Sequence, residues 1–443
     1  MARPQPSVTA SRISARKGFA NRPWTCSGSP EHGRRPCARR WTSTSTISRR
    51  RSARGCCSPP TPATRARPAA RSWLRGRRAE HSRPAPPRPR RARLSTLISS
   101  LQRTFRKDAA LMKSLEVVLA RPVADMPVAA DFHVVERETD AVAQGQLLVR
   151  VLDLSLDPYI GSRLRGRHLG GAAPTVGGRL PGECVAQVLE SKAEGFAPGD
   201  IVAGEVGWSE YGVLDAGKAR KLDPRAEPSA HLSVLGMPGL TAWAGVTQLA
   251  KVGSGDIFTV DAAAGPVGGV AGQLARLLGA KAYGIAGGAE KCALVRDVYG
   301  FDDCFDYRVE GWTDRVAEAL PEGQTVHFEN VGASVLTPML QRLRVGGRIV
   351  LCGLAEHYQN STPATLPVGT VIGKRAHVHG LVVYDFYPRW AEWIELATPW
   401  VLSGQLKVVE DAVQGLDKAA AHFERLMRGQ NQGKALVKIA ARA

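Results

Sequence analysis

The stretch 257–278 constrains the fold most, because a strand-like run, a glycine-rich turn and a helix-like run follow one another directly. Its first four residues are mostly apolar, and its last twelve repeat apolar side chains at spacings of three and four. Between them Gly265 permits a tight turn, Gly268 lets the backbone approach a pyrophosphate, and Gly272 lets helix and strand pack closely. The helix start would face that anion with free N–H groups. The pattern predicts a mononucleotide-binding unit, although Ala263 occupies the position of the first glycine in G-x-G-x-x-G, so a Gly/Ala-rich buried helix start stays open.

The formal charge of +20 is distributed unevenly along the 443 residues. Residues 1–110 contain 27 Lys and Arg against 3 Asp and Glu, whereas the rest of the chain contains 33 against 37. The basic segment is also rich in Ser, Pro and Ala and has no sustained helix or strand period, so we expect disorder over 1–111. Three interpretations stay open: a transit peptide, a basic arm that binds nucleic acid, or an extension before a true start at Met112, which we favour.

Cysteine usage and hydropathy limit the class of protein. No run of about 18 apolar residues occurs, so no membrane span is expected. The four cysteines after the basic segment are scattered without a C-x-x-C spacing: Cys184, Cys292, Cys304 and Cys352. Scattered cysteines are typical of free thiols in a reducing compartment, so we expect a cytoplasmic protein, or an organellar one if residues 1–111 are a transit peptide.

Patterning divides the rest of the chain into two architectures, giving an α/β fold class. Residues 112–231 read as short strands separated by Gly and Pro turns, which predicts a small β-barrel. Residues 232–402 alternate apolar strands with helix patterns, which predicts a doubly wound parallel sheet with ligand beyond the carboxyl ends of its strands. Residues 403–443 end in a helix and a strand that we expect to return to the first domain.

The end of the second strand in this sheet indicates the cofactor. An NAD site places Asp or Glu about 20 residues past the glycines. Here the strand end at 284–288 is small and uncharged, and Lys291 follows. Small residues leave room for a 2′-phosphate and a lysine supplies its counter-charge, which favours NADP(H). An ordinary exposed lysine in a first helical turn is the alternative interpretation of Lys291.

The sequence offers no convincing metal site. A catalytic zinc needs about three converging Cys, His, Asp or Glu ligands. Cys184 has no Cys or His neighbour in sequence, and His377 and His379 merely share a face of a predicted strand. We therefore expect no metal, and no Ser/His/Asp or Cys/His arrangement for nucleophilic catalysis stands out.

Five collinear motifs carry a family resemblance. They are LSLDPYI at 154–160, LGMPGLTAW at 235–243, the glycine turn at 262–272 with residues 284–292, FENVG at 328–332, and GQNQGK at 429–434. On these motifs, residues 112–443 resemble the medium-chain dehydrogenase/reductase superfamily. Within it they are most similar to the zinc-independent, NADP-dependent double-bond reductases, which act on prostaglandins, alkenals and curcumin.

The resemblance implies a GroES-like barrel and a Rossmann domain with cofactor and substrate in the cleft between them, in a homodimer. Carried over by position, the implied pyrophosphate-binding residues are Gly265, Pro266, Val267 and Gly268, with Lys291 at the 2′-phosphate and Tyr307 nearby. The implied nicotinamide-side residues are Asn330, Cys352, Gly353, Tyr358, Leu381, Val382, Val383 and Asn431. The implied reaction is metal-free hydride transfer from NADPH to the β-carbon of an enone or enal, followed by protonation of the α-carbon.

Two departures affect the proton donor and the substrate loop. Gly373 stands where some relatives have a tyrosine assigned to substrate handling or protonation, so Tyr159, Tyr358 or water takes that role. The loop 354–360 carries an extra Gln between its Tyr and Asn. Two other functions stay open: an NADPH quinone oxidoreductase of the same superfamily, and a non-catalytic NADP-binding protein whose basic arm binds nucleic acid. The DPY and MPGLTAW motifs favour the double-bond reductase.

Overall fold

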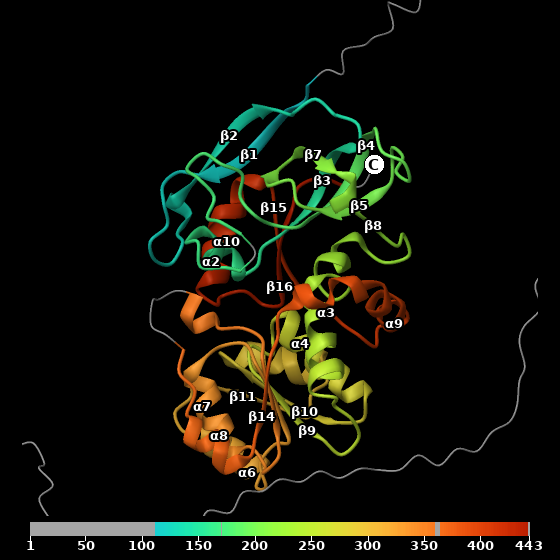
Figure 1. The fold of residues 1–443 in the computed structure, drawn as a ribbon. Coiled ribbons are helices and arrows are strands. Elements are labelled where there is room, and N and C mark those ends of the chain that lie inside the picture. Colours follow the sequence, from blue (N-terminus) through green and yellow to red (C-terminus); the bar gives the residue numbers. More distant parts are fainter. Residues whose placement is uncertain (1–110, 170, 359–363, 442–443) are drawn as a thin grey trace, which may run out of the picture. The chain divides into compact units, whose positions relative to one another are not determined.

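The computed structural model describes residues 111–169, 171–358 and 364–441 (Figure 1). The predicted disorder of the basic segment therefore lies outside the described residues, except for Leu111. The two ends of the described sequence form two mostly antiparallel sheets, and the residues between them form one parallel sheet. None of its helices is long and apolar enough to cross a membrane.

Two sheets build the first domain, and all their strand pairs except β15–β16 are antiparallel. The smaller has the order β2-β1-β6, from β1 (Lys113–Leu119), β2 (Phe132–Glu138) and β6 (Trp208–Ser209). The larger has the order β15-β16-β3-β4-β5-β8, and β7 also pairs with β3. Its strands are β3 (Gln146–Ser155), β4 (Cys184–Ser191), β5 (Ile201–Gly204), β7 (Tyr211–Asp215), β8 (Arg220–Lys221), β15 (Glu410–Gln414) and β16 (Lys434–Lys438). Leu147, Val149 and Val151 are fully buried because alternate residues of a strand face the core.

The C-terminal segment completes this domain. Strand β16 pairs antiparallel with β3, with Leu436 opposite Ser155. Helix α10 (Ala419–Met427) lies in the same core, where the Phe423 ring packs edge-on against Trp208 at 5.4 Å between ring centroids. Strand β15, which pairs parallel with β16, has the polar sequence EDAVQ and lacked a strand pattern.

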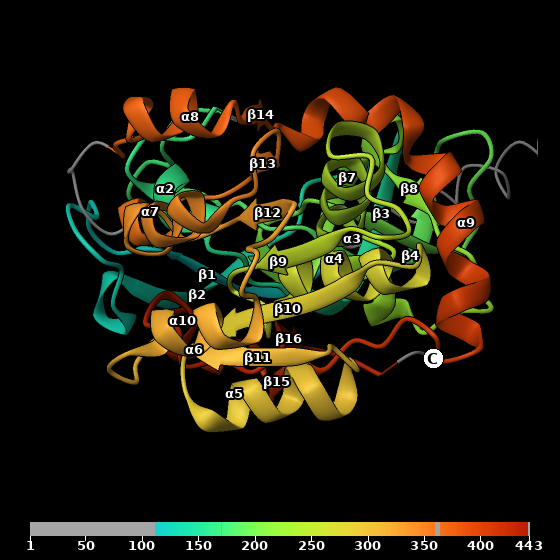
Figure 2. The ribbon, with the colours of Figure 1, turned by 90° about the horizontal axis from the view of Figure 1, so that it is seen from below.

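The middle of the chain forms a six-stranded sheet that is parallel throughout, so the predicted doubly wound fold is confirmed. Its order is β11-β10-β9-β12-β13-β14, visible in Figure 2 from β11 at the bottom to β14 at the top. Counted from β9 this is 3-2-1-4-5-6, whose switch point between β9 and β12 is the expected ligand site. The strands are β9 (Ile257–Val260), β10 (Lys281–Ala286), β11 (Asp303–Asp306), β12 (Val326–Glu329), β13 (Arg348–Leu351) and β14 (His377–Gly380).

Helices connect and flank this sheet. They are α3 (Met237–Trp243), α4 (Pro266–Leu277), α5 (Ala289–Ala293), α6 (Trp312–Ala319), α7 (Ala333–Arg342), α8 (Val368–Lys374) and α9 (Trp390–Leu402); α2 (Tyr159–Leu164) belongs to the first domain. Short π-helical turns extend α3 over Ala244–Leu249 and α5 over Leu294–Val298. The short 3-10 helices are Ala129–Asp131, Ala216–Lys218, Pro228–Leu232, Ala355–Tyr358, Val383–Arg389 and Leu416–Lys418.

The glycines of the β9–α4 turn do not all act as the sequence suggested. Gly265 has an extended backbone, and the left-handed residue of the turn is Ala262, with φ of 45°. A Cβ on Gly268 would lie 2.6 Å from the carbonyl oxygen of Ala262, so glycine there lets α4 begin against the turn. A Cβ on Gly272 would lie 1.8 Å from Cζ of Phe301, so this glycine accommodates an aromatic ring rather than the strand.

Candidate functional site

A cavity of about 770 Å³ opens at the switch point of the parallel sheet and is also bordered by the first domain. The structure brings all the sequence-predicted site residues to its border: Tyr159, Gly265, Pro266, Val267, Gly268, Lys291, Tyr307, Asn330, Cys352, Gly353, Tyr358, Leu381, Val382, Val383 and Asn431. Gly373 is not among the bordering residues; it is an exposed residue of α8. The roles of the bordering residues stay predictions; the structure shows that they converge on one cavity.

The start of helix α4 borders the cavity. Helix α4 starts there with Pro266 as its first residue, which has no N–H to leave unpaired. The N–H groups of Val267 and Gly268 belong to the first turn, whose donors have no partner within the helix. Oriented N–H groups at a helix start attract an anion. This helix start therefore suits the pyrophosphate predicted from the glycine turn.

A cluster of two cations and one phenol lies beside the end of β10. Lys291 donates a hydrogen bond from Nζ to the carbonyl oxygen of Gly429 at 2.7 Å. The guanidinium of Arg308 lies 6.0 Å from the ring centroid of Tyr307. A Cβ on Gly287 would come within 2.7 Å of Tyr307 Oη and 2.9 Å of Arg308 Nε, so the small residue at the strand end makes room for both side chains.

The electrostatics of this cluster favour an anion. Burial, and after it the positive charge of Arg308, lowers the pKa of Lys291 below its ordinary value. Two cations that repel one another beside a cavity are both stabilised by a dianion such as a 2′-phosphate. Arg308 was not identified from the sequence, although it directly follows Tyr307 at the end of a predicted strand.

The first domain contributes a tyrosine held by a buried ion pair. The carboxylate of Asp157 accepts hydrogen bonds from Nζ of Lys434 at 2.5 Å and from the hydroxyl of Ser155. Lys434 is fully buried on β16, and its Nζ also donates to the carbonyl oxygen of Leu156 at 3.1 Å. Asp157 precedes Pro158 and Tyr159, so these contacts fix the loop that places Tyr159 at the cavity.

Three tyrosines and a histidine also border the cavity: Tyr159, Tyr358, Tyr384 and His168. Burial raises the pKa of Tyr159 well above its ordinary value and also raises the pKa of Tyr358, so both phenols stay protonated. The ring of His168 lies 5.1 Å from that of Tyr159 and 6.2 Å from that of Tyr384. His168 and Tyr384 were missed because one lies in a loop and the other in a short 3-10 helix, and neither belongs to a motif. The extra Gln359 lies outside the described residues.

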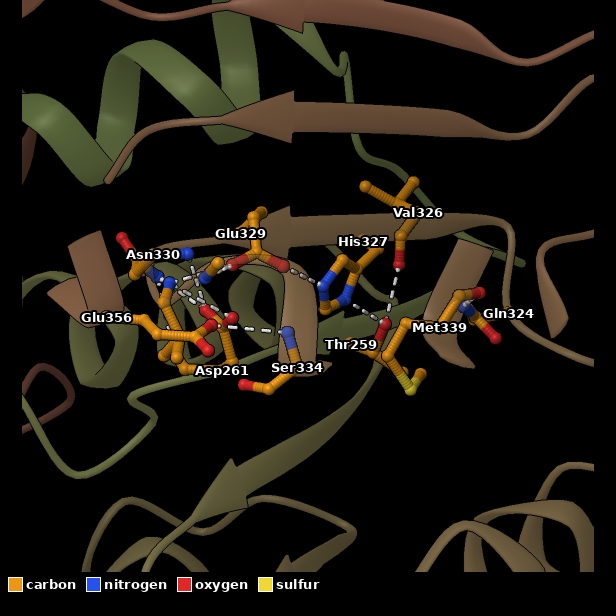
Figure 3. Close-up of polar contacts among 12 residues, drawn as sticks. Thr259, Asp261, Gln324, Val326, His327, Glu329, Asn330, Ser334, Met339 and Glu356 are labelled. Atoms are coloured by element: carbon orange, nitrogen blue, oxygen red, sulfur yellow. Dashed lines mark hydrogen bonds and ion pairs between the residues drawn. The ribbon is translucent and has the colours of Figure 1, made fainter. Parts of the chain in front are cut away.

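Asn330 follows β12 and is held by Asp261, which directly follows β9. Oδ1 of Asp261 accepts from the backbone N–H of Asn330 at 2.6 Å and from its side-chain Nδ2 at 3.2 Å (Figure 3). Nδ2 also lies 3.2 Å from the carbonyl oxygen of Asp261. Adjacent strands β9 and β12 bring these residues together, as their carboxyl ends meet at one edge of the sheet.

Asp261, His327 and Glu329 place ligand-type atoms within 4.8 Å of one another, but their bonding does not fit a catalytic zinc. All three side chains are fully buried. Nε2 of His327 lies 3.0 Å from Glu329 Oε2, and Nδ1 lies 3.0 Å from the hydroxyl of Thr259. Each carboxyl also accepts backbone N–H groups. A catalytic zinc keeps a position open for substrate, whereas these atoms are engaged with one another and with the backbone.

Comparison with known proteins identifies the family. Residues 116–222 match the family described as N-terminal domain of oxidoreductase, and residues 266–401 match that described as zinc-binding dehydrogenase. The NADPH-dependent curcumin reductase of Escherichia coli (strain K12) is 35% identical over 332 residues, covering 73% of this chain and 96% of the relative. The chain belongs to the medium-chain dehydrogenase/reductase family. The resemblance predicted from the five motifs is therefore confirmed.

A second curated relative and a solved structure are similar to this chain over most of its described length. The NADP-dependent 2-alkenal reductase of Nicotiana tabacum is 35% identical over 300 residues, covering 66% of this chain and 87% of the relative. The crystal structure of CurA from Vibrio vulnificus in complex with NADPH superposes with a TM-score of 0.69 at 32% identity, covering 74% of this chain and 99% of that structure. The similarity to this chain therefore covers most of the tobacco enzyme and nearly all of the CurA structure.

Proposed function

We propose that this family member uses NADPH to reduce activated C=C bonds of α,β-unsaturated aldehydes and ketones. The observation that carries the proposal is a cavity that is bordered by the start of α4, Lys291 and protonated tyrosines. Arg308 lies beside one of its bordering residues, Tyr307. The relatives named as curcumin and 2-alkenal reductases support the same class of substrate. NADPH, when bound, supplies the hydride that the β-carbon of the substrate receives.

Within this proposal the chain's own residues bind, orient and donate. Val267 and Gly268 bind the pyrophosphate, and Lys291 with Arg308 binds the 2′-phosphate. Tyr159 and Tyr358 supply O–H donors to the carbonyl oxygen of the substrate, where negative charge develops in the transition state. Because burial keeps both phenols protonated at neutral pH, either one can also return a proton to the α-carbon.

The test follows NADPH oxidation by the full chain with a 2-alkenal, a linear enone, a cyclic enone and a quinone, with NADH as the cofactor control. We expect turnover of enals and enones with NADPH. Tyr159→Phe should lower kcat by about 100-fold if it is the proton donor. Tyr211→Phe changes a tyrosine of β7 that does not border the cavity, and should leave the rate unchanged.

The outcomes separate the alternatives. Turnover of the quinone alone would assign the chain to quinone reduction. NADPH binding without turnover of any substrate would favour the non-catalytic interpretation, in which a basic arm at 1–111 binds nucleic acid. That interpretation requires nucleic-acid binding that weakens steeply as salt increases.

We also propose that the protein is a homodimer formed at β14. This strand lies at the edge of the parallel sheet and pairs only with β13 among the described strands. Nearby α8 exposes 62% of Val368 and 70% of Ile372, which is apolar surface that a second copy would cover. Sedimentation velocity should give a dimer for the full chain and a monomer for Ile372→Asp; a wild-type monomer would overturn the proposal.

A cytoplasmic location is the compartment we propose. Cys184, Cys292, Cys304 and Cys352 are all free thiols in the described chain, as expected in a reducing environment. Fractionation of cells that express the full chain from its own start should place it in the cytosol. Recovery from an organelle, with loss of the basic segment, would support the transit-peptide interpretation instead.

A further inference from the structure

A buried acidic pair beside the cavity has no part in the proposed reaction. Asp261 directly follows β9, and Glu329 is the last residue of β12 (Figure 3). Both side chains are fully buried. Two ionised carboxylates cannot be buried side by side without a large free-energy cost, so the pair must carry a proton or a counter-charge. The hydrogen bonds around each carboxyl group show which.

Glu329 is surrounded by donors. Its Oε1 accepts from the N–H of Val331 at 2.7 Å and from the N–H of Gly332 at 2.6 Å. Its Oε2 lies 3.0 Å from Nε2 of His327. Burial lowers the pKa of His327, so this ring is neutral and carries one N–H. The tautomer decides whether Nε2 donates to Glu329, because the hydroxyl of Thr259 lies 3.0 Å from Nδ1 and also donates to the carbonyl oxygen of Val326 at 3.1 Å. Two short backbone N–H donors to one carboxyl group favour its ionised form.

Asp261 accepts only one short hydrogen bond from a backbone N–H. Its Oδ1 accepts twice from Asn330, and its Oδ2 has only a long contact of 3.3 Å with the N–H of Val331. Burial, and after it the negative charge of Glu329, raises the pKa of Asp261 well above its ordinary value. Burial also raises the pKa of Glu329, but the hydrogen bonds it accepts oppose that rise. The proton therefore belongs on Oδ2 of Asp261, directed at Glu329.

This arrangement fixes the orientation of the Asn330 side chain. Both acceptors near Nδ2, the Oδ1 and the backbone carbonyl oxygen of Asp261, require the NH₂ group of the amide. The amide oxygen of Asn330 then accepts from none of the described residues. Since Asn330 borders the cavity, its free oxygen is available to a ligand that carries N–H or O–H donors.

We infer that Asp261 and Glu329 hold one proton between them, on Asp261, and that Asp261 thereby positions Asn330 as a hydrogen-bond acceptor for the nicotinamide half of the cofactor. The inference rests on the proposed function, because it needs the cofactor to bind in this cavity. Asp261 is a positioning residue and does not itself reach the ligand. The donors that Asn330 would receive are the hydroxyls of a ribose or the NH₂ group of a carboxamide.

If Asp261 is protonated, Asp261→Asn and Asp261→Leu should affect NADPH binding to different extents. Asp261→Asn places an NH₂ group where the carboxylic acid has its O–H and keeps an oxygen toward Asn330, so the dissociation constant of NADPH should change by no more than about threefold. Asp261→Leu removes the acceptor and should raise it by about tenfold or more. Glu329→Gln turns an NH₂ group toward donors and should weaken binding similarly.

Isothermal titration with three probes locates the effect. NADPH and NADH share the nicotinamide half, so Asp261→Leu should weaken both by the same factor. Adenosine 2′,5′-bisphosphate lacks that half, so its binding should not change. Asp131→Leu removes a buried carboxyl of the first domain that does not border the cavity, and should leave all three probes unaffected. A carboxylic-acid C=O band in the infrared spectrum of the wild type should disappear in Asp261→Asn.

Defined results would overturn the inference. If Asp261→Asn weakens NADPH binding as much as Asp261→Leu, Asp261 is ionised and the shared proton is wrong. If Asp261→Leu also loses adenosine 2′,5′-bisphosphate, the residue does not act on the nicotinamide half. A wild type that binds no NADPH contradicts the proposed function instead, and the infrared band still tests the shared proton by its presence or absence.

Discussion

Replacing Lys291 should convert a cofactor-selective site into an unselective one. Its Nζ is half-buried at the cavity border, 2.7 Å from the carbonyl oxygen of Gly429, and is positioned for a charge-assisted bond to a 2′-phosphate. Such bonds contribute about 1.5–3 kcal/mol, so Lys291→Ala should raise the dissociation constant of NADPH by about 10- to 100-fold. Arg308 is exposed and more strongly screened, so Arg308→Ala should raise it only about fivefold.

The two substitutions should not be independent. The charge of Arg308 contributes to the lowered pKa of Lys291, which means that the two cations repel each other in the empty site. Binding of a dianion relieves this repulsion only while both cations are present. Either single variant therefore removes this favourable contribution completely. The double variant should raise the dissociation constant of NADPH by less than the product of the factors for the two single variants.

Titration calorimetry with NADPH and NADH is the assay. NADH has no 2′-phosphate, so its dissociation constant should stay within about twofold in every variant. Lys281→Ala changes an exposed lysine at the opposite end of β10 and is the matched control. An equal loss of NADH and NADPH affinity in Lys291→Ala would refute the reasoning, because it would assign the lysine a role common to both cofactors.

Three further predictions concern stability and pH. Gly272→Ala should lower the free energy of unfolding by about 3 kcal/mol, since its Cβ would overlap the ring of Phe301, and Phe301→Leu in the same chain should restore much of it in urea melts. Burial raises the pKa of Glu183 from 4.5 to about 7, so the stability that its neutral form contributes is present below pH 4.5 and lost by about pH 7. Glu183→Gln should therefore match the wild type at pH 4.5 and exceed it by up to about 3 kcal/mol at pH 8; a gap that does not change with pH would contradict this. Lys434→Met leaves the buried charge of Asp157 unpaired and should lower the free energy of unfolding by about 3–5 kcal/mol in urea melts. Adding Asp157→Asn should restore part of this loss. A Lys434→Met protein as stable as the wild type would contradict the prediction.

The parts of the fold that were predictable carry their signal locally. Strands β9 and β10 and helix α4 have apolar runs or a 3.6-residue period within their own sequence, and all three lie within a residue of the expected bounds. Strand β15 has no such run, because it lies at a sheet edge and is only partly buried. Its pairing depends on β16, which the sequence of β15 does not encode.

The candidate site likewise combines residues that local motifs predict with contacts that only strand pairing creates. Lys291 and Asn330 belong to short motifs, so their positions could be carried over from a family. The cation cluster with Arg308 depends on the distance between the ends of β10 and β11, and no spacing in the sequence specifies it. Likewise, His327 and Glu329 alternate on one predicted strand, but their contact with Asp261 exists only because β12 pairs with β9.

Lys434 also has a consequence for biosynthesis. It reaches Asp157 across 277 residues of chain, and its strand lies between β3 and β15 in the interior of a sheet. A ribosome releases the whole parallel-sheet domain before it releases this strand. The parallel-sheet domain can therefore fold during synthesis, whereas the barrel has an unfilled gap beside β3 until β16 emerges. Truncation of a few C-terminal residues should then leave a folded middle and an open, aggregation-prone first domain.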